Sequence, residues 1–153
     1  APARALAGCG FDLHKAPTFA FNSIAVMGNS PFSNYLRRQL RAAGTVEVLP
    51  PDQADKADAV LELLGECRNN VVLSTTPEGQ VRELQLILTL RFRVRGQGGK
   101  ELLGPTEIQQ SRDITYNETA ALAKEGEAEL LYRDMQNDIA QQVLRRLAAI
   151  KAF

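Results

Sequence analysis

Between Leu84 and Arg95 the sequence alternates strictly between two sets of side chains. The apolar set consists of Leu84, Leu86, Leu88, Leu90, Phe92 and Val94, and the other, mostly polar set of Gln85, Ile87, Thr89, Arg91, Arg93 and Arg95. Successive side chains of a β-strand point to opposite faces of its sheet, so this pattern predicts a long strand with one buried and one polar face. The fold must therefore contain a sheet that is covered on one side.

The segments around this strand also have the pattern of extended chain. Residues 59–75 predict a long strand, and we expect one of its faces to carry Leu61, Leu63, Cys67, Val71 and Leu73. Residues 76–80 predict a hairpin turn in which Gly79 supplies a positive φ. A second turn at residues 96–100 leads to a strand over residues 102–116, where Pro105 is tolerable near the start. Residues 21–28 indicate a shorter strand.

Two amphipathic helices complete the pattern. Ser30 is a suitable N-cap with Pro31 at the first helical position, and Gly44 ends the helix. Its apolar stripe is Phe32, Leu36, Leu40 and Ala43, and Arg37, Arg38 and Arg41 lie off that stripe. A final helix, capped by Asn117 or Thr119, has the stripe Ala128, Leu131, Met135, Ile139, Val143, Leu147 and Ile150. Because Gly126 is a poor helix former, we expect residues 120–124 to form a separate turn.

These elements predict an α+β fold in which two helices pack on one face of a four-stranded, largely antiparallel (mixed) sheet. The short apolar run at residues 46–49 is stopped by Pro50 and Pro51, and residues 52–58 predict a loop or a turn of helix. The length of 153 residues fits one domain, which we expect to span residues 20–153.

Cys9 follows Leu6-Ala7-Gly8, which matches the lipobox of bacterial lipoprotein precursors. We therefore expect lipid attachment at Cys9, with residues 1–8 a signal-peptide remnant and residues 9–19 a lipidated tether. A structural cysteine and a chance match are the alternatives. If Cys9 is acylated, Cys67 has no disulfide partner, and we expect it to be buried as a small apolar residue.

Composition and motifs argue against several functions. Eighteen basic residues balance eighteen acidic ones, so net charge does not point to nucleic acid. The one histidine, His14, lies in the predicted tether, and no cysteine or histidine cluster has the spacing of a metal site. No apolar run approaches the ~20 residues of a membrane-spanning helix. We expect a protein that is not an enzyme and has no cofactor.

Two basic features remain as candidate binding residues. Arg91, Arg93 and Arg95, with Arg82 upstream, are expected to form a row of guanidinium groups on the polar sheet face. Alternate side chains of a strand lie ~7 Å apart, a spacing that suits neighbouring phosphates or carboxylates. Residue types alone favour an ordinary solvated face. Lys124, considered alone, is an ordinary surface lysine.

Four segments, taken in order, resemble the LptE (RlpB) lipopolysaccharide-assembly lipoproteins. Residues 7–14 (AGCGFDLH) are similar to the family's opening, and residues 32–40 (FSNYLRRQL) to its L-S-x-x-x-R-x-Q-L segment. Residues 78–80 (EGQ) and 83–86 (ELQL) resemble its D-G-Q…E-Y-Q hairpin. Residues 117–147 follow its N-x-x-x-A-L-A-K…M…Q-L-x-R-x-L terminus without a gap. The resemblance covers nearly the whole chain.

The resemblance implies a non-catalytic outer-membrane lipoprotein on the periplasmic face. It would plug and help to assemble the LptD β-barrel and bind lipopolysaccharide on its way to the cell surface. The family's lipid-attachment cysteine corresponds to Cys9, and its lipopolysaccharide-contacting lysine to Lys124. A second basic position falls on Pro77, which cannot bind an anion, so Arg82 is a substitute candidate beside Arg91 and Arg93. The alternative is a lipid carrier or transport auxiliary lipoprotein that does not plug a barrel; it would need an apolar cavity.

Overall fold

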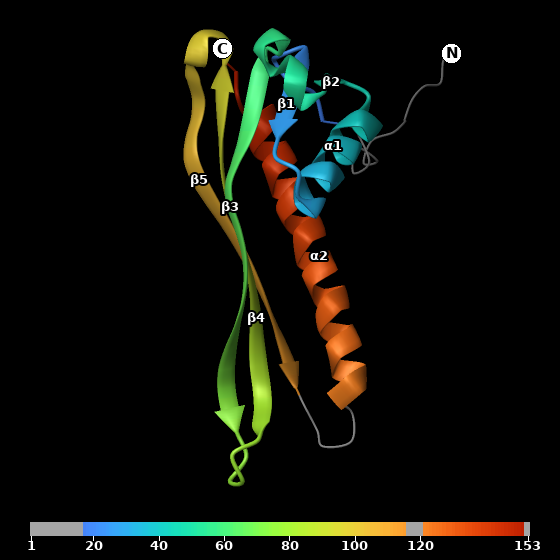
Figure 1. Cartoon of the computed structure of the whole chain (residues 1–153), viewed down its shortest axis with the longest axis vertical. Coiled ribbons are helices and arrows are strands. Elements are labelled where there is room, and N and C mark those ends of the chain that lie inside the picture. The colour runs from blue at the N-terminus through green and yellow to red at the C-terminus, as the bar shows by residue number, and fades with distance from the viewer. Residues whose placement is uncertain (1–16, 116–120, 152–153) are drawn as a thin grey trace, which may run out of the picture.

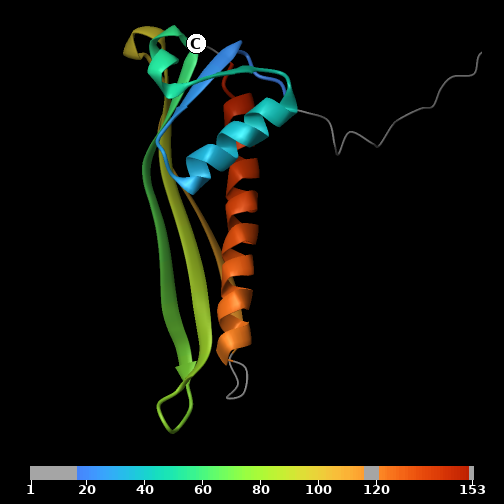
Figure 2. The same ribbon diagram turned by 45° about the vertical axis from the view of Figure 1, so that its right-hand side comes forward.

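The computed structural model describes residues 17–115 and 121–151; for residues 121–125 it describes the backbone alone. In chain order the elements are β1 (Ser23–Met27), α1 (Pro31–Ala43), β2 (Glu47–Leu49), the 3-10 helix η2 (Pro51–Lys56), β3 (Ala59–Thr75), β4 (Val81–Gly96), the 3-10 turn η3 (Gln97–Gly99), β5 (Glu101–Thr115) and α2 (Ala121–Ala148). Both helices lie on the same side of one sheet (Figures 1 and 2). The α+β prediction is confirmed.

The sheet has five strands in the order β2-β1-β3-β4-β5, one more than predicted. The additional strand, β2, lies at the edge and pairs with β1 in parallel. β1 also pairs in parallel with the start of β3, whereas β3–β4 and β4–β5 are antiparallel. The sheet is therefore mixed, as predicted, and its antiparallel part is a long three-stranded ribbon (Figure 1).

The alternation in β4 is confirmed. Leu86, Leu88, Leu90, Phe92 and Val94 are all buried. They pack in one core with α1 residues such as Leu36 and with α2 residues such as Met135 and Ile139. A second, smaller cluster of Ala25, Ala57 and Val60 lies beside η2 residue Ala54. Burial of the strand's apolar face against both helices is the main force that holds the layers together.

The predicted start and end of α1 are confirmed. The Ser30 hydroxyl accepts from the Ser33 N–H at 3.1 Å, and the Ser33 hydroxyl accepts from the Ser30 N–H at 2.9 Å. This reciprocal capping satisfies two amides at the start of the helix. Gly44 ends α1 with φ 70°, which is a left-handed conformation that glycine adopts without strain. By contrast, the prediction of a break at Gly126 is wrong, because α2 runs continuously through it.

The predicted face of β3 is wrong beyond Leu63. Leu61 pairs with Val94 and Leu63 with Phe92, but the next pair is Gly65 with Arg91, so Leu64 is an extra residue. This β-bulge shifts the alternation by one. Even-numbered residues from Glu66 to Val72 therefore share the face of the buried leucines of β4, up to a second register shift after Val72. In agreement, the Arg68 guanidinium carbon lies 4.6 Å from the centre of the Tyr132 ring on α2. Cys67 consequently lies on the opposite face, where it is exposed rather than buried.

Candidate functional site

The predicted arginine row is real but is partly neutralised. Arg91, Arg93 and Arg95 lie on the face of β4 that points away from the helices. The Arg93 and Arg95 Nε atoms both contact Glu62 Oε1, at 2.8 and 3.2 Å, and Arg91 is opposite Glu107 on β5. Three arginines thus share their surface with two glutamates. This surface therefore carries mixed charge, and it is less electropositive than the three arginines in the sequence led us to expect.

Arg82 does not belong to that row. It is exposed near the β3–β4 hairpin, at a register shift where Ser74 pairs with Glu83 and Thr75 with Val81, so Arg82 is an extra residue outside the regular ladder. Nine residues at ~3.3 Å each also place it ~30 Å from Arg91 along the strand. The prediction that it joins the guanidinium row is therefore wrong, and any anion that it binds is contacted separately.

The roles that the resemblance gives to Lys124 and Cys9 stay predictions, because the structure describes neither side chain. Lys124 lies within α2, close to its first residue, Ala121, but its side chain is outside the described part of the chain. Cys9 and the lone histidine, His14, also lie outside the described residues. Because α2 continues through Gly126, Lys124 is part of a regular helix rather than of a separate turn.

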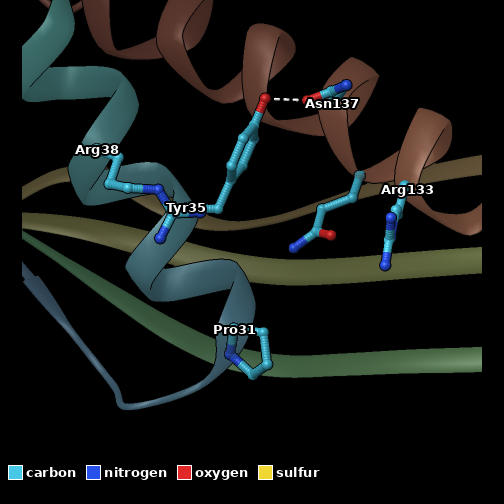
Figure 3. Close-up of a pocket in the computed structure, with 6 residues that line it drawn as sticks. Pro31, Tyr35, Arg38, Arg133 and Asn137 are labelled. Carbon is cyan, nitrogen blue, oxygen red and sulfur yellow. Dashed lines mark hydrogen bonds between the residues drawn. The ribbon is translucent and has the colours of Figure 1, made fainter.

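A cleft between α1 and α2 was not predicted. Its volume is about 320 Å³, and it is lined by Pro31, Tyr35 and Arg38 of α1 and by Arg133, Gln136 and Asn137 of α2. Tyr35 reaches across from α1, and its hydroxyl donates a hydrogen bond to Asn137 Oδ1 (Figure 3). The Arg38 guanidinium carbon lies 5.7 Å from the centre of the Tyr35 ring. The cleft is thus built around one contact between the two helices.

The charged residues that line this cleft are both positive. None of its six described lining residues is acidic, and two are arginines. Burial raises the pKa of Tyr35, and the neighbouring positive charge of Arg38 opposes that shift. Tyr35 therefore stays a neutral hydrogen-bond donor at physiological pH. Sequence reasoning missed this site because its two sides are about a hundred residues apart in the chain; the only signal was a tyrosine and two arginines off the apolar stripes.

The described residues offer no other recognisable chemistry. Across residues 17–115 and 121–151, no three or more His, Cys, Asp or Glu side chains gather in a way that could hold a metal ion. Neither helix, over its described residues, combines the length and apolarity needed to cross a membrane. The space between α2 and the sheet is filled by buried apolar side chains, including Phe92, Met135 and Ile139.

The family model and the related proteins that this chain matches all belong to one family. A model of the LptE family, described as Lipopolysaccharide-assembly, matches residues 18–147. The LPS-assembly lipoprotein LptE of Yersinia enterocolitica is 29% identical over 151 residues, which cover 95% of this chain and 71% of that protein. The LptE of Yersinia pestis strain Pestoides F is 30% identical over 153 residues, with the same coverage.

Solved structures agree. An uncharacterized lipoprotein B from Nitrosomonas europaea superposes with a TM-score of 0.77 at 27% identity, covering 92% of each chain. The rare lipoprotein B from Shewanella oneidensis gives a TM-score of 0.70 at 29% identity, covering 84% of this chain and 95% of that one. The fold is thus that of a group of bacterial lipoproteins. The chain belongs to the LptE lipopolysaccharide-assembly family, so it is an assembly protein and not an enzyme, as the sequence predicted.

Proposed function

We propose that this protein is a lipid-anchored outer-membrane lipoprotein that plugs and helps to assemble an LptD-type β-barrel and binds lipopolysaccharide during its delivery to the cell surface. The observation that carries the proposal is the family match, which spans residues 18–147 and therefore every described helix and strand from β1 to most of α2. Its relatives are themselves named LPS-assembly lipoproteins.

The shape of the molecule supports a plug rather than a carrier. The ribbon β3–β5 and helix α2 form a long, narrow body (Figure 1). Its core is filled by side chains such as Leu88, Phe92 and Ile139, whereas a lipid carrier needs an apolar cavity there. On the opposite sheet face, polar side chains such as Thr89, Arg91 and Gln109 are uncovered, as a surface that lines a water-filled barrel lumen requires.

A plug is surrounded by its barrel, whereas an auxiliary protein docks through one face. Photo-cross-linking residues placed at Gln109, on the open sheet face, and at Arg145, on the exposed side of α2, test this difference in cells that express the barrel partner. We expect both positions to capture the same barrel protein. Capture from only one position would refute the plug and favour the auxiliary lipoprotein.

Lipopolysaccharide binding is assigned to Lys124, with Arg82, Arg91 and Arg93 as further candidates. Lipid A phosphates are multivalent anions, and a charge-assisted contact to one is worth about a tenfold change in affinity. We therefore expect Lys124→Asp to weaken capture of purified lipopolysaccharide about tenfold. Lys100→Asp, an exposed lysine in the β4–β5 turn, is the matched control and should bind normally. Equal capture by both variants would remove Lys124 from the site.

The lipid anchor is assigned to Cys9. Cys9→Ala should release the protein from membranes when it is expressed without any barrel partner, because the other cysteine, Cys67, follows Leu64-Gly65-Glu66, which is not a lipobox. Retention of this variant in the outer-membrane fraction would refute the anchor, independently of the barrel and lipopolysaccharide experiments.

A further inference from the structure

The two arginines that line the cleft between α1 and α2 are partnered differently from Arg68 and Arg112, which lie on the sheet beside α2. Arg112 Nη2 contacts Asp138 Oδ2 at 2.6 Å and Asp134 Oδ2 at 3.2 Å, and Arg68 contacts Glu129 at 3.3 Å. The side of α2 that faces the sheet therefore pairs its charges. Within the described part of the chain, Arg38 and Arg133 have no carboxylate partner.

These two arginines are brought to the same cleft by different helices. Arg38 extends from α1 beside Tyr35, and Arg133 extends from α2 on the other side of the cleft (Figure 3). The Tyr35–Asn137 hydrogen bond ties the two helices together at this point. The two arginines therefore extend from regular helices that are in contact at this point, rather than from a loop.

We propose that this cleft binds a phosphate monoester group. A phosphate monoester carries a charge of about −1.5 to −2 near neutral pH, which two guanidinium groups balance. Each guanidinium presents a planar fork of N–H donors that fits two phosphate oxygens. The Gln136 side chain adds an uncharged amide to the lining, and no described lining residue repels an anion.

The size of the cleft indicates what the phosphate is attached to. At about 320 Å³ it lies at the lower end of the range for small-molecule sites. It therefore accommodates a phosphate with the first sugar ring that carries it, but not a lipid chain. A phosphorylated sugar headgroup, either free or on a glycolipid, has this chemistry. Binding of a free sugar phosphate does not depend on the proposed function; only the glycolipid source does.

Titration of the full-length protein with glucose 1-phosphate, followed by NMR, tests the inference, with glucose as the uncharged control. The side-chain amide signals of Gln136 and Asn137 report on the cleft. We expect them to shift with glucose 1-phosphate and not with glucose. Arg38→Gln and Arg133→Gln should each weaken binding about tenfold, which is the usual value for losing a charged hydrogen bond.

Arg41→Gln on α1 and Arg145→Gln on α2 are matched controls, because both arginines are exposed on the same helices but do not line the cleft. They should leave binding within about twofold, as removal of a distant exposed charge does. Equal weakening by controls and cleft variants, or unshifted amide signals at saturating glucose 1-phosphate, would overturn the proposal.

A second arm identifies the source of the phosphate. Detergent-dispersed lipid A and its enzymatically dephosphorylated form are compared on the same variants. If only phosphorylated lipid A loses capture in Arg38→Gln and Arg133→Gln, the cleft site is supported with a glycolipid as its source. If glucose 1-phosphate binds through these arginines but lipid A capture is unchanged, the site is supported with a free sugar phosphate as its source. The Lys124→Asp experiment remains a separate test of the proposed function.

Discussion

Arg37 ties the first helix to the sheet, and its replacement should destabilise the fold. It is only 8% exposed. Its Nη2 and Nε donate to the Val26 carbonyl at 2.7 and 3.2 Å, and Nη1 donates to Asn34 Oδ1 at 2.6 Å. Nη2 also donates to the Gly28 carbonyl. Val26 belongs to β1 and Gly28 follows it, so one side chain fixes the position of α1 relative to that strand.

The expected size of the effect follows from these contacts. A hydrogen bond from a charged donor contributes about 1.5–3 kcal/mol, and carbonyls left without a donor add a desolvation cost. Burial of the guanidinium lowers the pKa of Arg37, as does the nearby charge of Arg41, so part of this gain is offset by desolvation of the cation. In Arg37→Met, where the methionine replaces the apolar stem, we expect a net loss of about 3 kcal/mol in the free energy of unfolding.

Urea denaturation measures this change, and thermal unfolding should show a Tm about 6–12 °C lower. Arg37→Lys should fall between the wild type and Arg37→Met, because an ammonium can reach some but not all of the acceptors. Arg41→Met, an exposed residue one turn later on α1, should change stability by less than about 0.5 kcal/mol. An Arg37→Met protein as stable as the Arg41→Met control would refute the assigned role.

Two further predictions concern pH and thiol reactivity. Burial raises the pKa of Tyr35 and Tyr132 above the ordinary value of 10.0, so the folded state holds both phenol protons more tightly than the unfolded state. Their contribution is therefore constant below pH 10.0 and declines as pH rises above it; the urea midpoint of Tyr35→Phe/Tyr132→Phe should decline less than that of the wild type. In a Cys9→Ser variant, exposed Cys67 should react with an aromatic disulfide reagent without urea; a reaction that requires unfolding would contradict its placement.

The parts of the fold that were predictable are those set by local chemistry and unbroken periodicity. The alternation from Leu84 to Val94 identifies β4 and its buried face, because a period of two over that length fits a strand and does not fit a helix. The Ser30 cap, Pro31 and Gly44 identify the limits of α1. The stripe through Met135 and Ile139 identifies α2.

The parts that failed depend on tertiary structure. β2 has three residues, too few to show a period, and it is a strand because β1 provides a paired edge. The bulge at Leu64 carries no composition signal, so the face of Cys67 was assigned by a count that the structure interrupts. Arg37 lies off the apolar stripe of α1 but is buried, since backbone carbonyls near the end of β1 replace its water.

For the candidate sites, sequence order was a poor guide to proximity. Arg91 and Arg93 were correctly placed on one face, yet Glu62, which neutralises Arg93, comes from a different strand. Arg82 is close to them in sequence but remote along the strand. The cleft of Arg38 and Arg133 required knowledge of how α1 crosses α2, and no pattern within either helix contains that information.

The extra residue at Leu64 has a consequence for how this hairpin can change in length. Beyond it, Arg68 and Asn70 meet Tyr132, whose hydroxyl donates to Asn70 Oδ1 at 2.6 Å. Deleting Leu64 would leave Leu63 opposite Phe92 and Gly65 opposite Arg91 in a regular ladder, so Arg68 and Asn70 would still face Tyr132. Deleting a paired residue such as Glu66 would instead turn Arg68 and Asn70 to the opposite face, because the side chains of a strand alternate with a period of two. Protein engineers who wish to shorten β3 by one residue should therefore remove Leu64 rather than a paired residue.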